Sequence, residues 1–433
     1  MKYWPQWRGP TATGVAPHGK PPLKWSESKN IRWKVAIPGR GHATPIIWGD
    51  RVYVQTAVKT AKTVEPKARA DKAPEERPNR RRRGRRNWMG SVEPTHIYKF
   101  ILVALDRQTG KTVWQKTLRE ELPHEGGHRD ASQASNSPVT DGKYLIAYFG
   151  SRGLYCLDME GKVLWEKDLG DMRTRLGFGE GSSPALYGDT VVVNWDHEGQ
   201  SFIVALDKKT GRQRWKIDRD EQTSWATPLI VEVRGEPQVI TSASGRIRSY
   251  DLKTGEVRWV CGGMTPNVIP SPVSGNDLVF AMSGFRGNAL RAIRYVDARG
   301  DITDSSAVAW KYDGNGTPYV PSPLLYRDTL YFLKRNNAIL SCFDAKTGKQ
   351  HYSKKRLEGL EGVYASPVGA ADRVYIVGRN GKTAVIKRGA EFELLAVNSL
   401  DDEFAASPAI VDHALYLRGR THLYCIAEGA TSD

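Results

Sequence analysis

The sequence predicts an all-β fold: an eight-bladed β-propeller with four antiparallel strands per blade, whose last blade is completed by an N-terminal strand. Three observations support this prediction. A Ser/Thr-Pro pair recurs eight times, strand-like segments follow each pair, and the last repeat lacks an outer strand that residues 31–37 can supply. The 433 residues include 42 Gly and 24 Pro, which favours many short strands and turns over a helical bundle.

The repeat is marked by the proline of each Ser/Thr-Pro pair. These prolines are Pro45, Pro138, Pro184, Pro228, Pro272, Pro323, Pro367 and Pro408. Successive spacings are 93, 46, 44, 44, 51, 44 and 41 residues. Removing about 35–45 residues from the first interval, which contains a basic stretch, restores the period. Four strands every 41–51 residues are typical of propeller blades, whereas a solenoid needs helices or shorter periods.

Each repeat contains further strand-like segments after its marker. The first are residues 51–57, 143–149, 190–195, 237–243, 277–283, 329–334, 373–378 and 414–419. The second are residues 100–106, 153–158, 202–207, 247–251, 289–293, 339–344, 383–388 and 422–427. A Thr-Gly turn often follows, and then a strand with a tryptophan: Trp114, Trp165, Trp215, Trp259 or Trp310. We expect these tryptophans to pack between blades.

The N-terminal strand closes the ring in this prediction. Residues 31–37, IRWKVAI, place Trp33 where other repeats place their tryptophan. Closure leaves no unpaired radial edge. The predicted organisation is therefore an N-terminal extension at 1–30, one propeller at 31–430 and a basic low-complexity insertion at 58–96 within blade one.

Several other classes of protein are disfavoured. No run of apolar residues approaches 18, and the start, MKYWPQWRGP, has no apolar core, so we expect neither a membrane span nor a signal peptide in this chain. Zinc ribbons and redox CxxC motifs are excluded because the four cysteines are far apart in sequence, and we expect them to be small buried hydrophobes: Cys156, Cys261, Cys342 and Cys425. There is no GxSxG elbow, phosphate loop or strand-linked GxGxxG.

One face of the predicted propeller gathers the unusual polar residues. With strands lettered A to D from the axis outward, the D–A and B–C loops share a face, and the Thr-Gly turns lie on the other. Six B–C loops carry an arginine at nearly the same position: Arg152, Arg246, Arg286, Arg335, Arg379 and Arg418. Blade eight adds a second arginine, Arg420. These side chains predict either a basic arc that binds anions or a solvated rim.

An acidic and histidine-rich sector is expected opposite the arginines. The candidate metal ligands in it are His124, His128, Asp130, Glu180, Asp196, His197 and Glu221. Such carboxylates also commonly cap backbone N–H groups in turns. The string from His124 to His128 matches HExxH, but that zinc chemistry needs a helix, which Pro123 and two glycines disfavour.

Residues 58–90 of the basic insertion carry half of the net charge of +16. Residues 58–90 hold 12 Lys or Arg and 4 Asp or Glu, and few apolar residues, so we expect a disordered segment. It is interpreted either as a tolerated, solvated loop or as an arm for a polyanion. Nucleic acid is therefore a conceivable partner but not the favoured one.

The repeat pattern ALDxxTGxxxW with Ser-Pro openings resembles the pyrroloquinoline-quinone (PQQ)-like β-propeller repeat of the quinoprotein alcohol dehydrogenase-like superfamily. The opening WPQWRGP, Trp4 to Pro10, resembles uncharacterised bacterial members more closely. The superfamily also contains the lipoprotein of the outer-membrane assembly machinery. The resemblance implies a periplasmic or secreted protein, the alternative being cytoplasmic. Its enzymes hold PQQ under an adjacent-cysteine disulfide beside calcium, and this chain has no adjacent cysteines.

The expected function is noncatalytic binding of an anionic ligand or a protein at the loop-rich face, by a monomer. The candidate binding residues are His42, Arg129, Arg152, Phe178, Trp195, Trp225, Arg246, Arg286, Tyr319, Arg335, Tyr364, Arg379, Arg418 and Arg420. The alternative is a PQQ-dependent or related dehydrogenase with its cofactor at the same mouth, where Phe404 is a further candidate for stacking on a flat ring. A hydrolase or lyase on this scaffold is the third reading, and the sequence assigns no catalytic residue.

Overall fold

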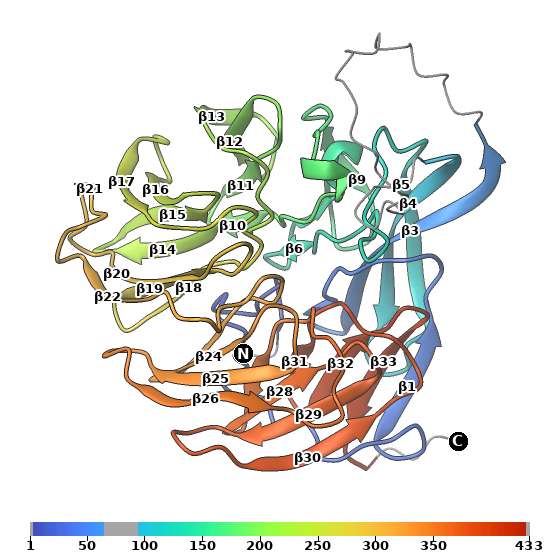
Figure 1. Ribbon diagram of the computed structural model, residues 1–433. Coiled ribbons are helices and arrows are strands. Elements are labelled where there is room, and N and C mark those ends of the chain that lie inside the picture. Colours follow the sequence, from blue (N-terminus) through green and yellow to red (C-terminus); the bar gives the residue numbers. More distant parts are fainter. Residues whose placement is uncertain (1–2, 65–93, 430–433) are drawn as a thin grey trace, which may run out of the picture.

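The computed structural model describes residues 3–64 and 94–429, and these form eight β-sheets arranged as a ring (Figure 1). The predicted eight-bladed propeller is confirmed. Chain colours follow the ring from blue through green and yellow to red, so that blade order is chain order. Helix is confined, among the described residues, to two short 3₁₀ turns, η1 (Gly150–Arg152) and η2 (Arg175–Gly177).

The first four blades follow the predicted repeats. Their strands, from the axis outward, are β2 (Ile46–Trp48), β3 (Arg51–Thr63), β4 (His96–Asp106) and β5 (Thr112–Glu121); β6 (Val139–Thr140), β7 (Leu145–Tyr148), β8 (Leu154–Leu157) and β9 (Val163–Lys167); β10 (Ala185–Tyr187), β11 (Thr190–Trp195), β12 (Ser201–Asp207) and β13 (Gln213–Arg219); and β14 (Leu229–Val233), β15 (Glu236–Ser242), β16 (Arg246–Asp251) and β17 (Val257–Gly262). The two middle strands of each blade are almost wholly buried, because they lie between neighbouring blades.

The last four blades repeat this arrangement. Their strands are β18 (Val273–Gly275), β19 (Leu278–Ser283), β20 (Ala289–Arg294) and β22 (Val308–Tyr312); β23 (Leu324–Tyr326), β24 (Thr329–Leu333), β25 (Ile339–Asp344) and β26 (Gln350–Arg356); β27 (Val368–Ala370), β28 (Arg373–Val377), β29 (Lys382–Lys387) and β30 (Leu394–Ser399); and β31 (Ala409–Val411), β32 (Ala414–Arg418), β33 (His422–Ala427) and β1 (Ile31–Ala36). All pairings inside these blades are antiparallel.

The N-terminal strand closes the ring as predicted. β1 pairs with β33, and Trp33 lies opposite Cys425. In Figure 1 the blue β1 lies beside the red β33. Because one sheet contains both ends of the propeller, the backbone hydrogen bonds of blade eight fasten the ring.

A ring of hydroxyl groups explains the Ser/Thr-Pro markers. In blades one to seven, the backbone N–H of the marker donates to the hydroxyl of the next blade's marker at 2.8–2.9 Å. The series is Thr44, Ser137, Ser183, Thr227, Ser271, Ser322, Ser366 and Ser407. The hydroxyl of Thr44 closes the circle on the carbonyl oxygen of Ser407 at 3.0 Å. The blades are thereby hydrogen-bonded to one another around the axis.

The outer-strand tryptophans fasten each blade to the next one. The indole N–H of Trp33 donates to the carbonyl of Arg107 at 3.0 Å, and that of Trp165 to the carbonyl of Lys208 at 2.8 Å. Gly211, in the Thr-Gly turn with φ 68°, lies under the Trp165 ring, and a Cβ there would approach the ring to 2.8 Å. The turn glycine therefore serves both the positive φ and the interblade contact.

The N-terminal segment fills the central channel of the ring, on the side opposite the D–A and B–C loops. Trp4 pairs with Ile47 of blade one, and Gly14 accepts a hydrogen bond from Gly369 of blade seven. Between them Arg8, 4% exposed, donates to the carbonyls of Pro323 and Pro367, both at 2.9 Å. The opening WPQWRGP motif thus acts as an axial plug.

Two features depart from the predicted repeat. Blade four carries a fifth strand, β21 (Gly300–Asp301), which pairs in parallel with β17 where the expected turn of blade five would lie. In blade one, β3 continues to Thr63, so residues 58–63 of the predicted insertion are strand; residues 65–93 lie outside the described residues. No helix within residues 3–64 and 94–429 is long and apolar enough to cross a membrane.

Candidate functional site

A cavity of about 470 Å³ opens at the axis of the ring, on the face of the D–A and B–C loops; we call it the mouth cavity. The hydroxyls of Ser137, Ser183, Ser366 and Ser407 line its depth, and Trp7 of the axial plug reaches it. The volume lies in the range of small-molecule sites. The two predicted loop families do share one face, because both contribute to this wall.

Aromatic side chains from different blades form the walls of the mouth cavity. They are Trp7, Phe178, Trp225, Phe285, Tyr319 and Tyr364. Phe285 and Tyr319 stack with ring centroids 5.0 Å apart, and Trp225 is fixed by its indole N–H, which donates to the carbonyl of Gly179 at 2.7 Å. Burial raises the pKa values of Tyr319 and Tyr364, so both phenols are protonated at neutral pH.

The charges around the mouth are partly compensated. Asp130 accepts hydrogen bonds from Arg379 at 3.0 Å and from Tyr364 at 3.2 Å. Arg286 is exposed, lies over the Phe285 ring at 5.3 Å, and has no carboxylate at ion-pairing distance among the described residues. The Arg175 guanidinium donates to the amide oxygen of Gln222 at 3.3 Å and has no carboxylate at ion-pairing distance within residues 3–64 and 94–429. Two cationic groups, Arg286 and Arg175, are therefore available at this mouth to an anionic ligand.

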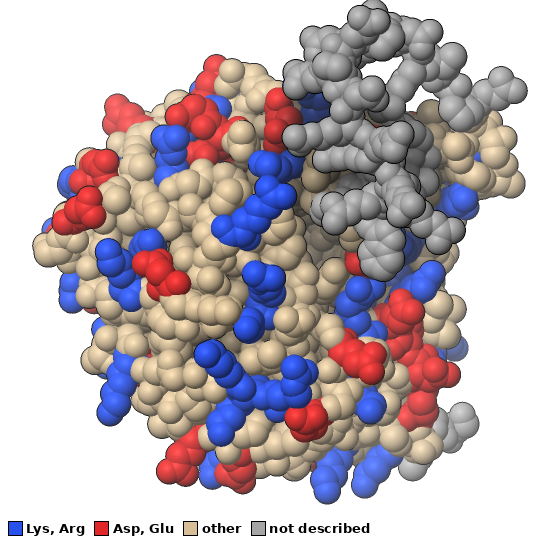
Figure 2. All heavy atoms as spheres, viewed as in Figure 1, with Lys and Arg blue, Asp and Glu red and all other residues tan. Residues whose placement is uncertain are grey.

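The repeated arginines do not form a continuous basic arc. Arg152 is buried and pairs with Glu121 at 2.8 Å, and Arg246 lies near Asp220 and Glu221. Arg379 pairs with Asp130 as above. On the face seen in Figure 2, basic side chains are interspersed with acidic ones. Only Arg152 and Arg418 of this set are buried, and carboxylate partners compensate the charge of the partly exposed Arg246 and Arg379.

The remaining binding candidates lie in several places. His42 lines the mouth cavity, whereas Arg129 and Arg152 line other, neighbouring cavities. Trp195 is 1% exposed and stacks on Phe202 in the core, so it faces no cavity. Arg335 is exposed on the loop of blade six. A second, smaller cavity is lined by Arg379, Arg418 and Arg420 together with Phe404, and it also contacts His42.

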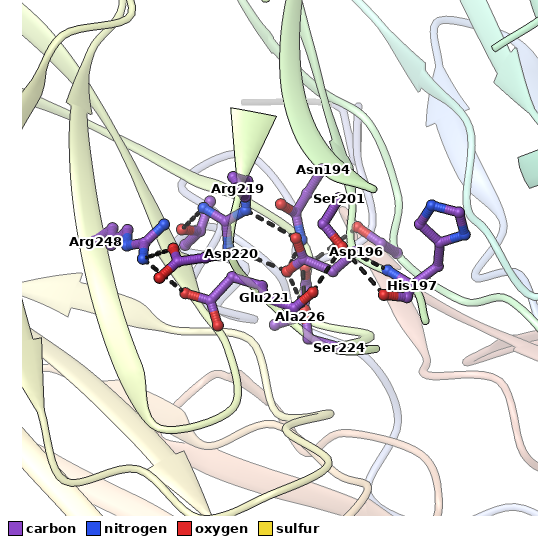
Figure 3. Close-up of polar contacts among 12 residues, drawn as sticks. Asn194, Asp196, His197, Ser201, Arg219, Asp220, Glu221, Ser224, Ala226 and Arg248 are labelled. Carbon is purple, nitrogen blue, oxygen red and sulfur yellow. Dashed lines mark hydrogen bonds and ion pairs between the residues drawn. The ribbon is translucent and has the colours of Figure 1, made fainter. Parts of the chain in front are cut away.

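The acidic sector is built around a fully buried ion pair within blade three, at its contact with blade four (Figure 3). The Asp196 carboxylate receives Arg219 at 2.8 and 3.1 Å, Asn194 at 3.0 Å and Ser224 at 2.6 Å. Both charged side chains are 0% exposed. Because each oxygen of Asp196 already accepts hydrogen bonds, this carboxylate serves the packing of the blades.

Glu221 lies beside this pair and is also buried. Burial raises its pKa to about 7, while Arg219 opposes the shift and Asp196 adds to it. Its nearest cations are Arg246 and Arg248, at 3.5 and 3.4 Å. Glu221 is thus a carboxyl group that changes charge near neutral pH.

Most of the other metal candidates are hydrogen-bonded to different partners, although His128 lies 3.7 Å from Asp130. His197 accepts a hydrogen bond from the backbone of Arg173, and His124 contacts the carbonyl of Met172. Glu180 accepts the backbone N–H and hydroxyl of Ser151 at 2.7 and 2.6 Å, and His128 meets Phe178 edge to face. Within the described part of the chain, no three His, Cys, Asp or Glu side chains are grouped so as to hold a metal ion. The segment from His124 to His128 is not helical.

Sequence reasoning missed several residues of the mouth, among them Trp7, Arg175 and Phe285. Arg175 lies in a D–A loop and Phe285 in a B–C loop, the two loop families predicted to share this face, so their position in the repeat could have found them. Trp7 gave no such signal, because it precedes the repeats and reaches the axis only through the folded plug.

Comparisons with known proteins place the chain among characterised propellers. A family profile described as "Outer membrane protein assembly factor BamB" matches residues 99–350, more than half of the 433 residues. The chain belongs to this family. The protein of that name from Yersinia pestis is 24% identical over 347 residues, which cover 70% of this chain and 83% of the relative. This agrees with the PQQ-like repeat that the sequence resembles.

Solved structures share the fold. BamB from Moraxella catarrhalis superposes with a TM-score of 0.53 at 14% identity, over 76% of this chain and 93% of that one. A europium-containing methanol dehydrogenase superposes with a TM-score of 0.64 at 12% identity, over 97% of this chain and 90% of that one. At these identities the likeness shows the fold alone.

The residues present do not fit the quinone and metal site that the resemblance implies. All four cysteines are buried, free and in separate blades, so no vicinal disulfide can form. The two carboxylates lining the mouth, Asp130 and Glu180, are each hydrogen-bonded elsewhere. The described residues therefore offer an aromatic, partly cationic cavity without the disulfide or a carboxylate cluster.

Proposed function

We propose that this protein is a noncatalytic binding propeller that holds a planar, anionic organic molecule in the mouth cavity. The observation that carries the proposal is the combination of aromatic walls with two arginines, Arg286 and Arg175, that have no carboxylate partner in the described part of the chain. Aromatic faces bind flat rings by stacking, and a guanidinium pairs with a carboxylate, sulfate or phosphate group.

The proposed contacts follow from the side chains on the cavity wall. Phe178, Trp225, Tyr319 and Tyr364, from four different blades, supply apolar surface around a ring. The two arginines supply the charge complement. His42 and the Ser hydroxyls deeper in the cavity supply neutral polar contacts.

The state of the acidic groups supports binding over catalysis. A general base needs a carboxylate or imidazole within reach of substrate and free to take a proton. Asp130 is tied to Arg379 and Tyr364, and these contacts, against the effect of burial, hold its pKa below the ordinary value. Burial, together with nearby arginines, lowers the pKa of His42 to about 3.

The proposal is tested with two ligands that share one aromatic ring system, one anionic and one neutral. We expect 2-naphthoate to bind with 1:1 stoichiometry in isothermal titration calorimetry, and the isosteric neutral amide 2-naphthamide to bind at least about tenfold more weakly. Arg286→Gln should remove most of this difference, and Trp225→Ala should weaken both ligands. Trp114→Phe, on the outer strand of blade one, is the matched control. Equal binding by acid and amide would refute an anionic ligand.

A second candidate function rests on the family. Its named members are outer-membrane assembly factors, which supports a protein partner at the same loop face and a periplasmic location for this chain. A partner segment with an acidic or aromatic side chain would use the same cavity. Competition between 2-naphthoate and acidic peptides that carry one Phe or Trp would separate the two: displacement at lower concentration by the peptide favours the protein partner.

The enzyme alternative rests on the likeness to the methanol dehydrogenase. Purified protein with PQQ and calcium, or with a lanthanide, should give no quinone-dependent dye reduction with alcohols or sugars. Turnover in that assay would overturn the noncatalytic proposal.

A further inference from the structure

A second cavity lies beside the mouth cavity, between the loops of blades seven, eight and one; we call it the Arg418 cavity. Four arginines line it, Arg40, Arg379, Arg418 and Arg420, together with His42 and Glu403. Its free volume of about 20 Å³ holds about one water-sized group, such as a single oxygen of an oxyanion. His42 and Ala405 line both cavities, so the two are neighbours.

Arg418 is the unusual member of this set. It ends strand β32 and is 1% exposed, yet its Nε, Nη1 and Nη2 atoms are buried without a hydrogen-bond partner among the described residues. Buried polar groups, and charged ones above all, are nearly always paired. Burial lowers the pKa of Arg418 only to about 10, so the guanidinium stays charged at neutral pH.

The other deeply buried arginines all have partners. Arg8 donates to two proline carbonyls, Arg152 pairs with Glu121, and Arg219 pairs with Asp196. Arg107 pairs with Asp412. An unpaired buried guanidinium is therefore a property of the Arg418 position and not of buried arginines in this fold.

The nearest acidic groups cannot supply the missing partner. Among the described residues, Asp402 is the one carboxylate whose charge raises the pKa of Arg418. Its oxygens already accept the backbone N–H groups of Arg420, Thr421 and His422 and the hydroxyl of Thr421. Glu403 pairs with Arg420 at 3.3 Å on the exposed side. Asp402 thereby fixes the loop that follows Arg418.

A second donor faces the same space without a full set of partners. Arg40 donates through Nη1 to the carbonyl of Arg129 at 3.1 Å, but its Nε is buried and unpaired. Arg379 keeps its pair with Asp130. His42 is neutral at pH 7, so its ring can donate one N–H without adding charge.

We propose that the Arg418 cavity is an anion site that binds one carboxylate, sulfate or phosphate group, with Arg418 as the charged fork and Arg40 and His42 as further donors. An oxyanion presents two or more oxygens to a guanidinium and would satisfy the orphaned N–H groups. The group can come from a free inorganic ion or from the acidic end of a ligand in the adjacent mouth cavity. The inference does not depend on the proposed mouth ligand.

Thermal unfolding with defined anions tests the site. In HEPES at fixed ionic strength, inorganic phosphate, sulfate and acetate are titrated separately against chloride. We expect at least one oxyanion to raise the Tm of the wild-type protein in a saturable way, by about 3 °C at a hundredfold excess over its Kd. General salting-out by sulfate is not saturable in the millimolar range and acts on every variant.

Substitution of the guanidinium gives the decisive comparison. Arg418→Met removes the buried charge, so we expect a Tm in anion-free buffer at or above the wild-type value and no saturable response. Arg335→Met, on the equivalent loop of blade six and exposed, should respond as the wild type does. If Arg418→Met does not fold, Arg40→Gln should raise the Kd at least about tenfold in calorimetric titration with the responding anion. A saturable response that both cavity variants retain, or its absence in the wild type, overturns the proposal.

The two sources of the anion are then separated. If the site takes a free ion, the oxyanion binds with the same Kd in Trp225→Ala. If it takes the acidic end of a mouth ligand, naphthalene dicarboxylate should bind more tightly than 2-naphthoate, and Arg418→Met should abolish the gain. Either result supports the anion site, and a gain unaffected by Arg418→Met contradicts the second source.

Discussion

Asp130 and Arg379 form an ion pair at 3.0 Å although 249 residues separate them in the chain. Asp130 lies in the long loop between blades one and two, and Arg379 in the B–C loop of blade seven. The pair therefore links the loop that enters blade two to a loop of blade seven, although blades eight and one lie between these two blades in the ring. The same contact places a negative charge on the wall of the mouth cavity.

Removing that charge should favour an anionic ligand. In Asp130→Asn, Arg379 loses its carboxylate partner and the repulsion at the cavity wall disappears. We expect 2-naphthoate to bind several-fold more tightly by calorimetry, while the free energy of unfolding falls by about 1 kcal/mol, since the pair is partly exposed. Asp218→Asn on the outer strand of blade three is the control. Weaker binding by Asp130→Asn would mean that Asp130 itself holds the ligand.

The Asp196–Arg219 pair should matter for stability. Asp196→Ala leaves the Arg219 guanidinium buried without its carboxylate, and breaking such a pair costs about 3–5 kcal/mol. We expect a loss of that order in urea unfolding, with unchanged 2-naphthoate affinity. Asp218→Ala, exposed and next to Arg219, should stay within about 0.5 kcal/mol of the wild type. A stable Asp196→Ala protein with lost binding would instead place Asp196 in the site.

Glu221 should make stability depend on pH near neutrality. Its pKa in the folded protein is about 7, above the ordinary value of 4.5, so between these pH values the folded state binds more protons than the unfolded state. The contribution of Glu221 to the free energy of unfolding therefore falls as the pH rises from about 4.5 to 7, and it stays low above pH 7.

Glu221→Gln should remove this dependence. We measure the free energy of unfolding of the variant and of the wild type at both pH values. The variant-minus-wild-type difference should be about 2–3 kcal/mol larger at pH 8 than at pH 4.5. Glu236→Gln, whose side chain is 59% exposed, is the control. A variant whose pH profile runs parallel to the wild-type profile would contradict the raised pKa.

The Trp33 side chain should report on ring closure. It is 7% exposed, donates to Arg107 of blade one and packs on Gly110 and Tyr416. Trp33→Ala is expected to cost about 3–5 kcal/mol. Deletion of residues 1–37, which also removes the axial plug, should prevent stable folding. Arg32→Ala, exposed on the same strand, should be nearly neutral. A monomeric deletion variant with an unchanged Tm would refute closure by the N-terminus.

The fold could be predicted from sequence because its signals are local and repeated eight times. Ser137-Pro138 and its equivalents recur because the marker hydroxyls of blades two to eight accept a hydrogen bond from the preceding blade. Trp165 and Gly211 recur since one packs on the other across blades. The lone parallel strand β21 in blade four has no counterpart in the other repeats, and it was missed.

The candidate site was harder to predict because its chemistry depends on which arginines lie close to a carboxylate in the folded protein. The loop position of Arg152, Arg286 and Arg418 is equivalent in sequence, yet one is paired, one is exposed and one is buried without a partner. That outcome is decided by neighbours such as Glu121 and Asp402, which come from other loops. Repeat position alone therefore located the mouth but not the state of each arginine.

The most direct test of the central claim is a crystal structure of the protein with 2-naphthoate bound. We predict the naphthalene ring in the mouth cavity, in contact with Trp225, and its carboxylate within 3.5 Å of Arg286 or Arg175, a distance set by hydrogen bonding. A ring bound elsewhere on the propeller, or a mouth cavity empty at a ligand concentration that saturates binding in solution, would contradict the account.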